Sequence, residues 1–166
     1  MLVQVPVRMP SLALYQPDIP QNAGSLMRLA ACLGIGVDVI EPCGFLWDEK
    51  RMRRAGMDYL DLVRVVRHPS FAAFLAARGD GRRLVLLSTG GDARLDRFAF
   101  SPADVIMLGR ESAGVPAEVA TAADVRLRIP MARAARSLNV AAAAALALGE
   151  ALRQLGGWTG DGEESE

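Results

Sequence analysis

Arg136-Ser137-Leu138-Asn139-Val140, followed by five alanines and Leu146-Ala147-Leu148, is the stretch of sequence that decides how the fold is read. Serine and asparagine side chains accept hydrogen bonds from the first free amides of a helix, so the stretch predicts a helix from about Leu138 to Leu155. Gly156-Gly157 is expected to end this helix. Small alanine side chains let other backbone segments come close. Core packing alone does not explain why two polar residues, Ser137 and Asn139, stand at the start of such a helix.

A second stretch, Leu108-Gly109-Arg110-Glu111-Ser112-Ala113-Gly114-Val115-Pro116, is a glycine-bracketed loop after an apolar segment. Taken alone, it fits an ordinary strand-to-helix connection as well as it fits a ligand loop. In the functional interpretation, Gly109 and Gly114 let the backbone approach a ligand, and Glu111 contacts a partner. Together with the Ser137-Leu138-Asn139 step, the loop predicts a binding site built from backbone between strands and helices.

Short, continuously apolar segments alternate with helical patterns along the chain. The predicted strands are 12–15, 37–40, 62–66, 84–87, 105–108 and 125–129, and the predicted helices are 22–33, 49–55, 69–77 and 138–155. Asn22 is the expected cap of the first helix. This alternation predicts an α/β fold with a mostly parallel sheet. The loops after the last three strands would then meet at the carboxyl edge of the sheet, where ligands usually bind.

Composition limits the class of protein. The chain has 166 residues, of which 51% are hydrophobic, but no apolar run reaches the roughly 18 residues that cross a bilayer. Residues 1–10 lack the apolar core of a signal peptide, so we expect a cytoplasmic protein with no membrane contact. We expect one domain over residues 1–157 and a disordered acidic tail over 158–166. Cys32 and Cys43 are expected to be free thiols, with Cys32 buried on the first helix.

Charge is balanced overall but unevenly distributed. The chain carries 19 basic and 19 acidic residues, and four of the acidic ones lie in the tail, which leaves 15 acidic against 19 basic side chains in the rest. The densest basic cluster consists of Lys50, Arg51, Arg53 and Arg54. A solvated helix face is the simplest interpretation of this cluster. Contact with nucleic-acid phosphates is the functional interpretation.

Signatures of other chemistries are missing from the sequence. The chain has no GxGxxG, P-loop or Gly-x-Ser-x-Gly pattern, and its two cysteines have no zinc spacing, so we expect no metal. His68, the only histidine, precedes Pro69, so we expect it at the surface or at a helix cap. Arg28 turns away from the apolar face of the first helix. A solvated arginine explains it, and phosphate binding near the helix start is the alternative.

Three motifs in the right order resemble the signatures of the SPOUT methyltransferases. They are Asn22-Ala-Gly24-Ser-Leu-Met-Arg28, the loop Leu108–Pro116, and Ile129-Pro130-Met131 with Ser137-Leu138-Asn139. Within that superfamily the chain resembles the TrmL-type tRNA 2′-O-methyltransferases in its short length and in three further stretches, 14–22, 41–45 and 50–59. The resemblance covers nearly the whole chain.

The resemblance implies a fold, a reaction and partners. The fold is an α/β sheet with a C-terminal trefoil knot, which periodicity could not reveal because knots are rare exceptions to chain topology. The reaction is methylation, with S-adenosylmethionine as donor, of the ribose 2′-hydroxyl at the wobble nucleotide, a cytidine or uridine derivative at position 34 of leucine tRNAs. The implied partners are the anticodon region of tRNA and a second copy of the chain. The alanine face of the last helix, beside the first helix, is the expected homodimer surface.

The resemblance also implies which residues act. Catalysis falls on Arg28, Asn139 and Ser137, with Arg28 either a base that loses its proton only when held by substrate phosphate or a stabiliser of the developing 2′-alkoxide. The residues implied for cofactor binding are Leu87, Ser88, Gly109, Glu111, Ile129, Ser137 and Leu138. The residues expected to bind RNA are Asn22, Arg28, Lys50, Arg51, Arg53 and Arg54.

Three alternatives remain open. A relative with the same motifs can act on another tRNA position or on ribosomal RNA, and only the product separates these reactions. A non-catalytic RNA-binding homologue is opposed by the joint presence of Arg28, Ser137 and Asn139. A metabolic nucleotide-binding protein is opposed by the missing dinucleotide fingerprint.

Overall fold

The computed structural model describes residues 9–54, 58–79 and 81–158. In chain order the elements are β1 (Ser11–Tyr15), α1 (Pro20–Leu33), β2 (Val37–Ile40), α2 (Glu49–Arg54), the 3₁₀ helix η1 (Asp58–Leu62), β3 (Val65–His68), α3 (Phe71–Arg78), β4 (Leu84–Leu87), β5 (Ala93–Arg94), the 3₁₀ helix η2 (Leu95–Arg97), β6 (Val105–Leu108), α4 (Ala117–Ala122), β7 (Val125–Arg128) and α5 (Val140–Leu155). The expected disordered tail falls outside the described residues, apart from Trp158. None of the helices in the described ranges combines the length and apolarity needed to cross a bilayer.

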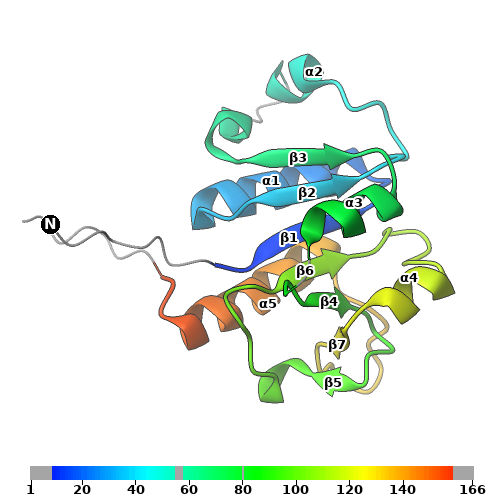
Figure 1. The fold of residues 1–166 in the computed structure, drawn as a ribbon, viewed down its shortest axis with the longest axis vertical. Helices are drawn as coiled ribbons and strands as arrows, with labels where there is room; N and C mark the ends of the chain where they lie inside the picture. The colour runs from blue at the N-terminus through cyan, green and yellow to red at the C-terminus, as the bar shows by residue number, and fades with distance from the viewer. Residues whose placement is uncertain (1–8, 55–57, 80, 159–166) are drawn as a thin grey trace, which may run out of the picture.

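The seven described strands form one sheet in the order β3-β2-β1-β6-β4-β7-β5 (Figure 1), and each of their pairings is parallel. The mostly parallel α/β sheet expected from the sequence is therefore confirmed. The chain first builds β1 to β3 outward on one side, then crosses to β4 and β5 and inserts β6 between β1 and β4. This order brings the carboxyl ends of β4, β6 and β7 side by side.

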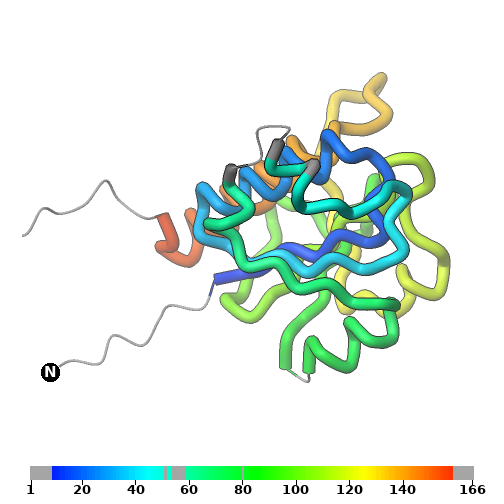
Figure 2. Tube along the Cα trace, turned by 90° about the horizontal axis from the view of Figure 1, so that it is seen from above, coloured from blue at the N-terminus to red at the C-terminus, as the bar shows by residue number. Residues whose placement is uncertain are grey.

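Helices cover both faces of the sheet (Figure 1), and the view from above separates α1 and α5 on one side from α3 on the other (Figure 2). Along β1, Leu12 and Leu14 belong to the buried cluster beneath α1 and α5, whereas Ala13 and Tyr15 belong to the cluster beneath α3 and α4. Successive strand side chains point to opposite faces. Since both faces are covered, the strands are apolar throughout rather than alternating with polar residues.

Most predicted strands have the expected bounds, and β2, β4 and β6 match residue for residue. The third strand exists, but its expected bounds, 62–66, are wrong, because Leu62 lies in η1 and is 71% exposed. Pairing with β2 decides the true bounds, since Val37 to Ile40 stand opposite Val65 to His68. The sequence did not predict β5 and α4, two short elements with too few residues to show a periodicity.

Three of the four predicted helices start two residues away from the predicted position, and α2 starts at Glu49 as predicted. Asn22 as the cap of α1 is wrong: α1 begins at Pro20, and its N-cap residue, Ile19, makes no side-chain bond. Proline suits the first turn because its missing amide needs no partner there. The last helix begins at Val140 because Asn139 is its cap, with Oδ1 accepting from the amides of residues 141 and 142 at 2.9 and 3.3 Å. The helix at Pro69 begins instead at Phe71, after a Ser70 cap.

Cys32 and His68 lie where the sequence did not place them. Cys32 is exposed rather than buried, because α1 turns it away from the sheet. His68 is buried rather than at the surface, since it is the last residue of β3, with Nε2 2.7 Å from Asp38 Oδ1 and its ring edge-on to Phe74. Both cysteines are free thiols, as expected. Burial, followed by the nearby charge of Glu41, raises the pKa of the Cys43 thiol to about 11.

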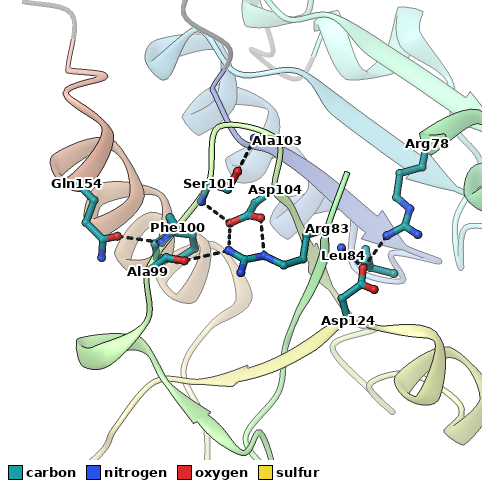
Figure 3. Close-up of polar contacts among 10 residues, drawn as sticks. All are labelled: Arg78, Arg83, Leu84, Ala99, Phe100, Ser101, Ala103, Asp104, Asp124 and Gln154. Carbon is teal, nitrogen blue, oxygen red and sulfur yellow. Dashed lines mark hydrogen bonds and ion pairs between the residues drawn. The ribbon is translucent and has the colours of Figure 1, made fainter. Parts of the chain in front are cut away.

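An ion pair ties the start of β4 to the start of β6 (Figure 3). Arg83 donates two hydrogen bonds of 2.8 Å to the carboxylate of Asp104, which is fully buried. The same carboxylate accepts from the amide of Ser101 at 2.8 Å. Gln154 of α5 accepts from the amide of Phe100 at 2.9 Å. The network therefore holds the connection before β6 against both the sheet and the last helix.

Candidate active site

A pocket of about 300 Å³ lies at the carboxyl edge of the sheet. Its lining comes from residues within 86–89, 108–115, 127–131 and 137–143, that is, from the ends of β4, β6 and β7 and from the segment that enters α5. Most of the lining side chains are aliphatic, and a few are polar. This composition is typical of sites that bind small organic ligands. Within the described ranges, no three His, Cys, Asp or Glu side chains gather as a metal site would need.

Every residue that the sequence assigned to cofactor binding lines this pocket. They are Leu87, Ser88, Gly109, Glu111, Ile129, Ser137 and Leu138. These residues come from four segments that are far apart in sequence, and the strand order brings them together. Their role as cofactor ligands stays a prediction.

The glycine loop after β6 closes on itself at one side of the pocket. Arg110 and Gly114 exchange both backbone hydrogen bonds, at 3.0 and 2.8 Å, and Gly114 has a φ of +60°. A Cβ atom added to Gly109 would lie 2.9 Å from the Cα and carbonyl carbon of Gly114. Real Cβ atoms do not approach backbone so closely, so this turn requires glycine at position 109.

Asp18 holds the same loop from the connection between β1 and α1. Its amide donates to Glu111 Oε2 at 3.2 Å, the amide of Glu111 donates to Asp18 Oδ1 at 3.0 Å, and the Ser112 hydroxyl donates to Asp18 Oδ2. The hydrogen bond from the Glu111 side chain is the main cause that lowers the pKa of Asp18 to about 2. Burial, and then the bond to Asp18, raises the pKa of Glu111. The hydrogen bonds between Asp18, Glu111 and Ser112 fix the loop.

The sequence patterns did not single out Asp18 as a candidate residue. The signal was present, because residue 18 lies inside the 14–22 stretch that carries part of the resemblance. No spacing rule connects it with Glu111, which lies 93 residues further on. Only the adjacency of β1 and β6 brings the two loops together.

Ser137 and Asn139, two of the three predicted catalytic residues, lie on the segment that enters α5. Ser137 lines the pocket and is exposed. Asn139 is not part of the lining: its Oδ1 caps α5, and its Nδ2 donates to Asn22 Oδ1 at 3.0 Å. The structure thus connects the first and third motifs through these two asparagines.

Arg28, the third predicted catalytic residue, lies outside the pocket lining of its own chain. It is exposed in the middle of α1 rather than at the helix start. Its guanidinium carbon lies 4.9 Å from the centroid of the Tyr59 ring in η1, a cation–π distance. Tyr59 was not among the candidate residues, although it ends the 50–59 stretch that carries the resemblance.

The basic cluster lies on the short helix α2. Lys50 is exposed. Arg53 is also exposed, but its Nη1 lies 2.5 Å from Asp61 Oδ1, so its charge already has a partner. The side chains of Arg51 and Arg54 fall outside the described part of the chain. The structure thus leaves RNA binding by this cluster as a prediction.

The chain belongs to the SpoU rRNA Methylase family, which its residues 9–149 match. The matched range includes all three motifs and every residue that lines the pocket. The resemblance to the SPOUT methyltransferases is thereby confirmed.

Two individual relatives share an enzyme name that is more specific than the family name. The tRNA (cytidine(34)-2′-O)-methyltransferase of Beijerinckia indica is 58% identical over 146 residues, which cover 87% of this chain and 91% of the relative. The enzyme of the same name from Escherichia coli K12 is 41% identical over 148 residues, covering 88% and 94%.

Solved structures agree in fold. A structure described as giving insights into the 2-OH methylation of C/U34 on tRNA has a TM-score of 0.85 and 45% identity, covering 91% of this chain and 99% of its own. The SpoU methyltransferase AviRb from Streptomyces viridochromogenes, in complex with the cofactor AdoMet, has a TM-score of 0.77 and 32% identity, covering 92% and 62%.

Proposed function

We propose that the protein transfers a methyl group from S-adenosylmethionine to the ribose 2′-hydroxyl of the wobble nucleotide, a cytidine or uridine derivative at position 34, in leucine tRNAs in the cytoplasm. One observation carries the proposal: the second and third family motifs, within 108–116 and 129–139, line one pocket together with the end of β4 at the carboxyl edge of the sheet. The names of the most similar relatives support nucleotide 34 as the target.

The pocket fits S-adenosylmethionine. Leu87, Ile129 and Leu138 offer an apolar surface for the adenine ring, while Ser88 and Ser137 offer hydroxyl groups. The tight turn at Gly109 exposes backbone to the ligand, which a side chain there would prevent. When bound, S-adenosylmethionine supplies a methyl group activated on a sulfonium. The remaining task of the protein is to hold the ribose oxygen in line with that group.

We assign to Arg28 the task of helping the 2′-hydroxyl lose its proton. A free guanidinium has a pKa above about 12 and is a poor base. Its positive charge suits the alkoxide that develops on the 2′-oxygen, and deprotonation would require tight contact with a substrate phosphate. Ser137 and Asn139 are proposed to orient the ribose or the donor's carboxylate. Glu111, engaged with Asp18, keeps the loop in shape.

A homodimer would complete the site, because Arg28 lies outside the pocket lining of its own chain. α5 packs beside α1, and its outer face carries exposed Ala142 and Ala145 and half-exposed Leu146. We assign the dimer contact to this face.

Leu146→Glu is expected to convert a dimer to a monomer in sedimentation experiments. A wild-type monomer at micromolar concentration would contradict the assignment.

The trefoil knot of the superfamily is part of the proposal. The segment between β7 and α5 passes the ends of β4 and β6, as Met131, Ser137 and Leu138 share a pocket with Leu87 and Leu108. Such a passage supports the threading that the resemblance implies. For tRNA, we assign contact with the anticodon region to Asn22, Arg28 and the basic helix α2.

Gly109→Ala is expected to weaken S-adenosylmethionine binding by about tenfold or more, because the new Cβ would push apart the backbone of the turn that lines the pocket. Isothermal titration calorimetry with S-adenosylmethionine measures this effect. Gly149→Ala is the control, since a Cβ atom there would make only an ordinary contact, 3.9 Å from the Trp158 ring, and that glycine lies outside the pocket. Equal affinity in the Gly109 variant and the wild type would contradict the assignment of this loop.

Tyr59→Leu is expected to lower the turnover of methyl transfer by about 2- to 30-fold, the range that a cation–π contact supports. The Tyr59 ring restrains the Arg28 guanidinium, so its loss should affect turnover and leave S-adenosylmethionine affinity unchanged. Tyr59→Phe keeps the ring face and should retain most of the activity. If the phenylalanine and leucine variants lose activity equally, the ring is not what positions Arg28.

Methyl transfer from labelled S-adenosylmethionine to unmodified leucine tRNA, followed by digestion to nucleosides, tests the proposed function. The expected product is 2′-O-methylated cytidine or uridine. Label in ribosomal RNA or in another tRNA, with none in leucine tRNA, would keep the enzyme class and overturn the substrate. Binding of S-adenosylmethionine with no transfer to any RNA would overturn catalysis and favour a non-catalytic RNA-binding homologue.

A further inference from the structure

A second cavity, of about 160 Å³, lies away from the active-site pocket and has a different lining. It opens at the amino ends of β1 to β3, beside the end of α3, and so at the opposite edge of the sheet from the first pocket. Ser11, Arg64, Arg78 and Arg82 contribute to its lining. Its volume is about half that of the active-site pocket.

The charges around this cavity are mainly positive. The Arg64 side chain is exposed and has no ion-pair or hydrogen-bond partner among the described residues. Arg82 Nη2 donates to the neutral hydroxyl of Ser11 at 2.6 Å, and no carboxylate in the described residues pairs with it. The one carboxylate in the lining, that of Asp38, is 2.7 Å from His68 Nε2 and so already has a partner. Two guanidinium groups are thus left without a counter-charge.

Arg78, which also belongs to the lining, has one hydrogen-bond donor without an acceptor. Its Nη1 pairs with Asp124 Oδ2 at 3.0 Å (Figure 3). Its Nε, in contrast, is buried and has no hydrogen-bond partner among the described residues. A buried donor without an acceptor costs free energy. An oxyanion in the cavity could accept from this donor only after the Arg78 side chain turned, since Nε has almost no exposed surface in this structure.

We propose that this arginine-lined cavity binds a phosphate group. Guanidinium groups match the geometry of phosphate oxygens and bind them with charge-assisted hydrogen bonds. Arg64 and Arg82 supply uncompensated charge, and Ser11 supplies a hydroxyl that can turn toward an anion. The phosphate can be a free anion or a phosphodiester of the RNA substrate, since both present the same oxygens.

Calorimetric titration with inorganic phosphate, at an ionic strength held constant with chloride, tests the site directly. We expect saturable binding to the wild type, weakened about tenfold or more in the Arg64→Gln/Arg82→Gln double variant. Arg97→Gln is the matched control, because that exposed arginine lies outside both pockets. Should the double variant fail to fold, Arg64→Gln alone replaces it, since its side chain makes no hydrogen bond in the described structure. Absence of saturable binding, or equal affinity in the variant, would overturn the proposal.

Two further results separate the sources of the phosphate, and this part rests on the proposed function. If the cavity receives an RNA phosphodiester, inorganic phosphate raises the KM for tRNA in the wild type, and the double variant has a raised KM that phosphate no longer changes. If it receives a free anion, the KM for tRNA is the same in both proteins. Either result supports the site. Failure of methyl transfer would overturn the proposed function and leave the calorimetric result standing.

Discussion

Replacing Arg28 by alanine is expected to lower the turnover of methyl transfer by about 10²–10⁴-fold, the usual contribution of a group that assists proton transfer. The guanidinium is exposed on α1 and held over the Tyr59 ring, where it can reach a substrate docked from outside. Because Arg28 does not line the pocket, the affinity for S-adenosylmethionine should stay unchanged. Single-turnover rates with saturating donor and tRNA, together with calorimetry, measure the two quantities separately.

Arg28→Lys separates the two roles open to this residue. A lysine keeps the positive charge, so if Arg28 only stabilises the alkoxide electrostatically, the lysine variant should retain part of the rate. If Arg28 is instead a base that loses its proton in contact with phosphate, the rate of the lysine variant should depend on pH differently from the rate of the wild type. Arg97→Ala is the control, as it removes an exposed arginine outside the pocket. A proportional loss of turnover and donor affinity in Arg28→Ala would refute the catalytic assignment.

Replacing Asp104 by leucine is expected to lower the free energy of unfolding by about 3 kcal/mol, the lower end of the cost of removing one partner from a buried ion pair. The Asp104 carboxylate is fully buried and accepts from Arg83 twice and from the amide of Ser101 (Figure 3). The lower end applies because the Arg83 side chain is 35% exposed, so water can solvate the charge left behind. Urea unfolding measures the change.

Two further variants test the reason for this loss. Arg83→Leu combined with Asp104→Leu removes both charges and should be less destabilised than Asp104→Leu alone. Asp96→Asn breaks the exposed pair with Arg94 and should leave stability nearly unchanged. If the single and double variants lose equal stability, the unpaired charge of Arg83 is not the cause.

Sequence patterns alone were sufficient to predict three of the strands. Strands β2, β4 and β6 are short apolar runs bounded by turns, and they occur as predicted. Register between strands is a property of two segments, so one segment cannot show it. That is why β3 begins at Val65 rather than Leu62 and why His68 is buried in the sheet instead of lying at the surface.

The candidate site was predictable to the extent that it is made of sequence motifs. The residues assigned to cofactor binding meet in one pocket because the ends of three parallel strands meet at one edge. Contacts between motifs could not be predicted: Asp18 with Glu111, Asn22 with Asn139, and Arg28 with Tyr59 each depend on the crossing of the chain. Single-sequence periodicity contains no information on that crossing.

Methyl transfer to two versions of a leucine tRNA, one with ribose and one with 2′-deoxyribose at nucleotide 34, decides whether the 2′-hydroxyl of that nucleotide accepts the methyl group. We expect one methyl group per ribose-containing tRNA, recovered as a 2′-O-methylated nucleoside, and no transfer to the 2′-deoxy tRNA. Equal transfer to both tRNAs would show that the methyl group goes to another position and would overturn the proposed reaction.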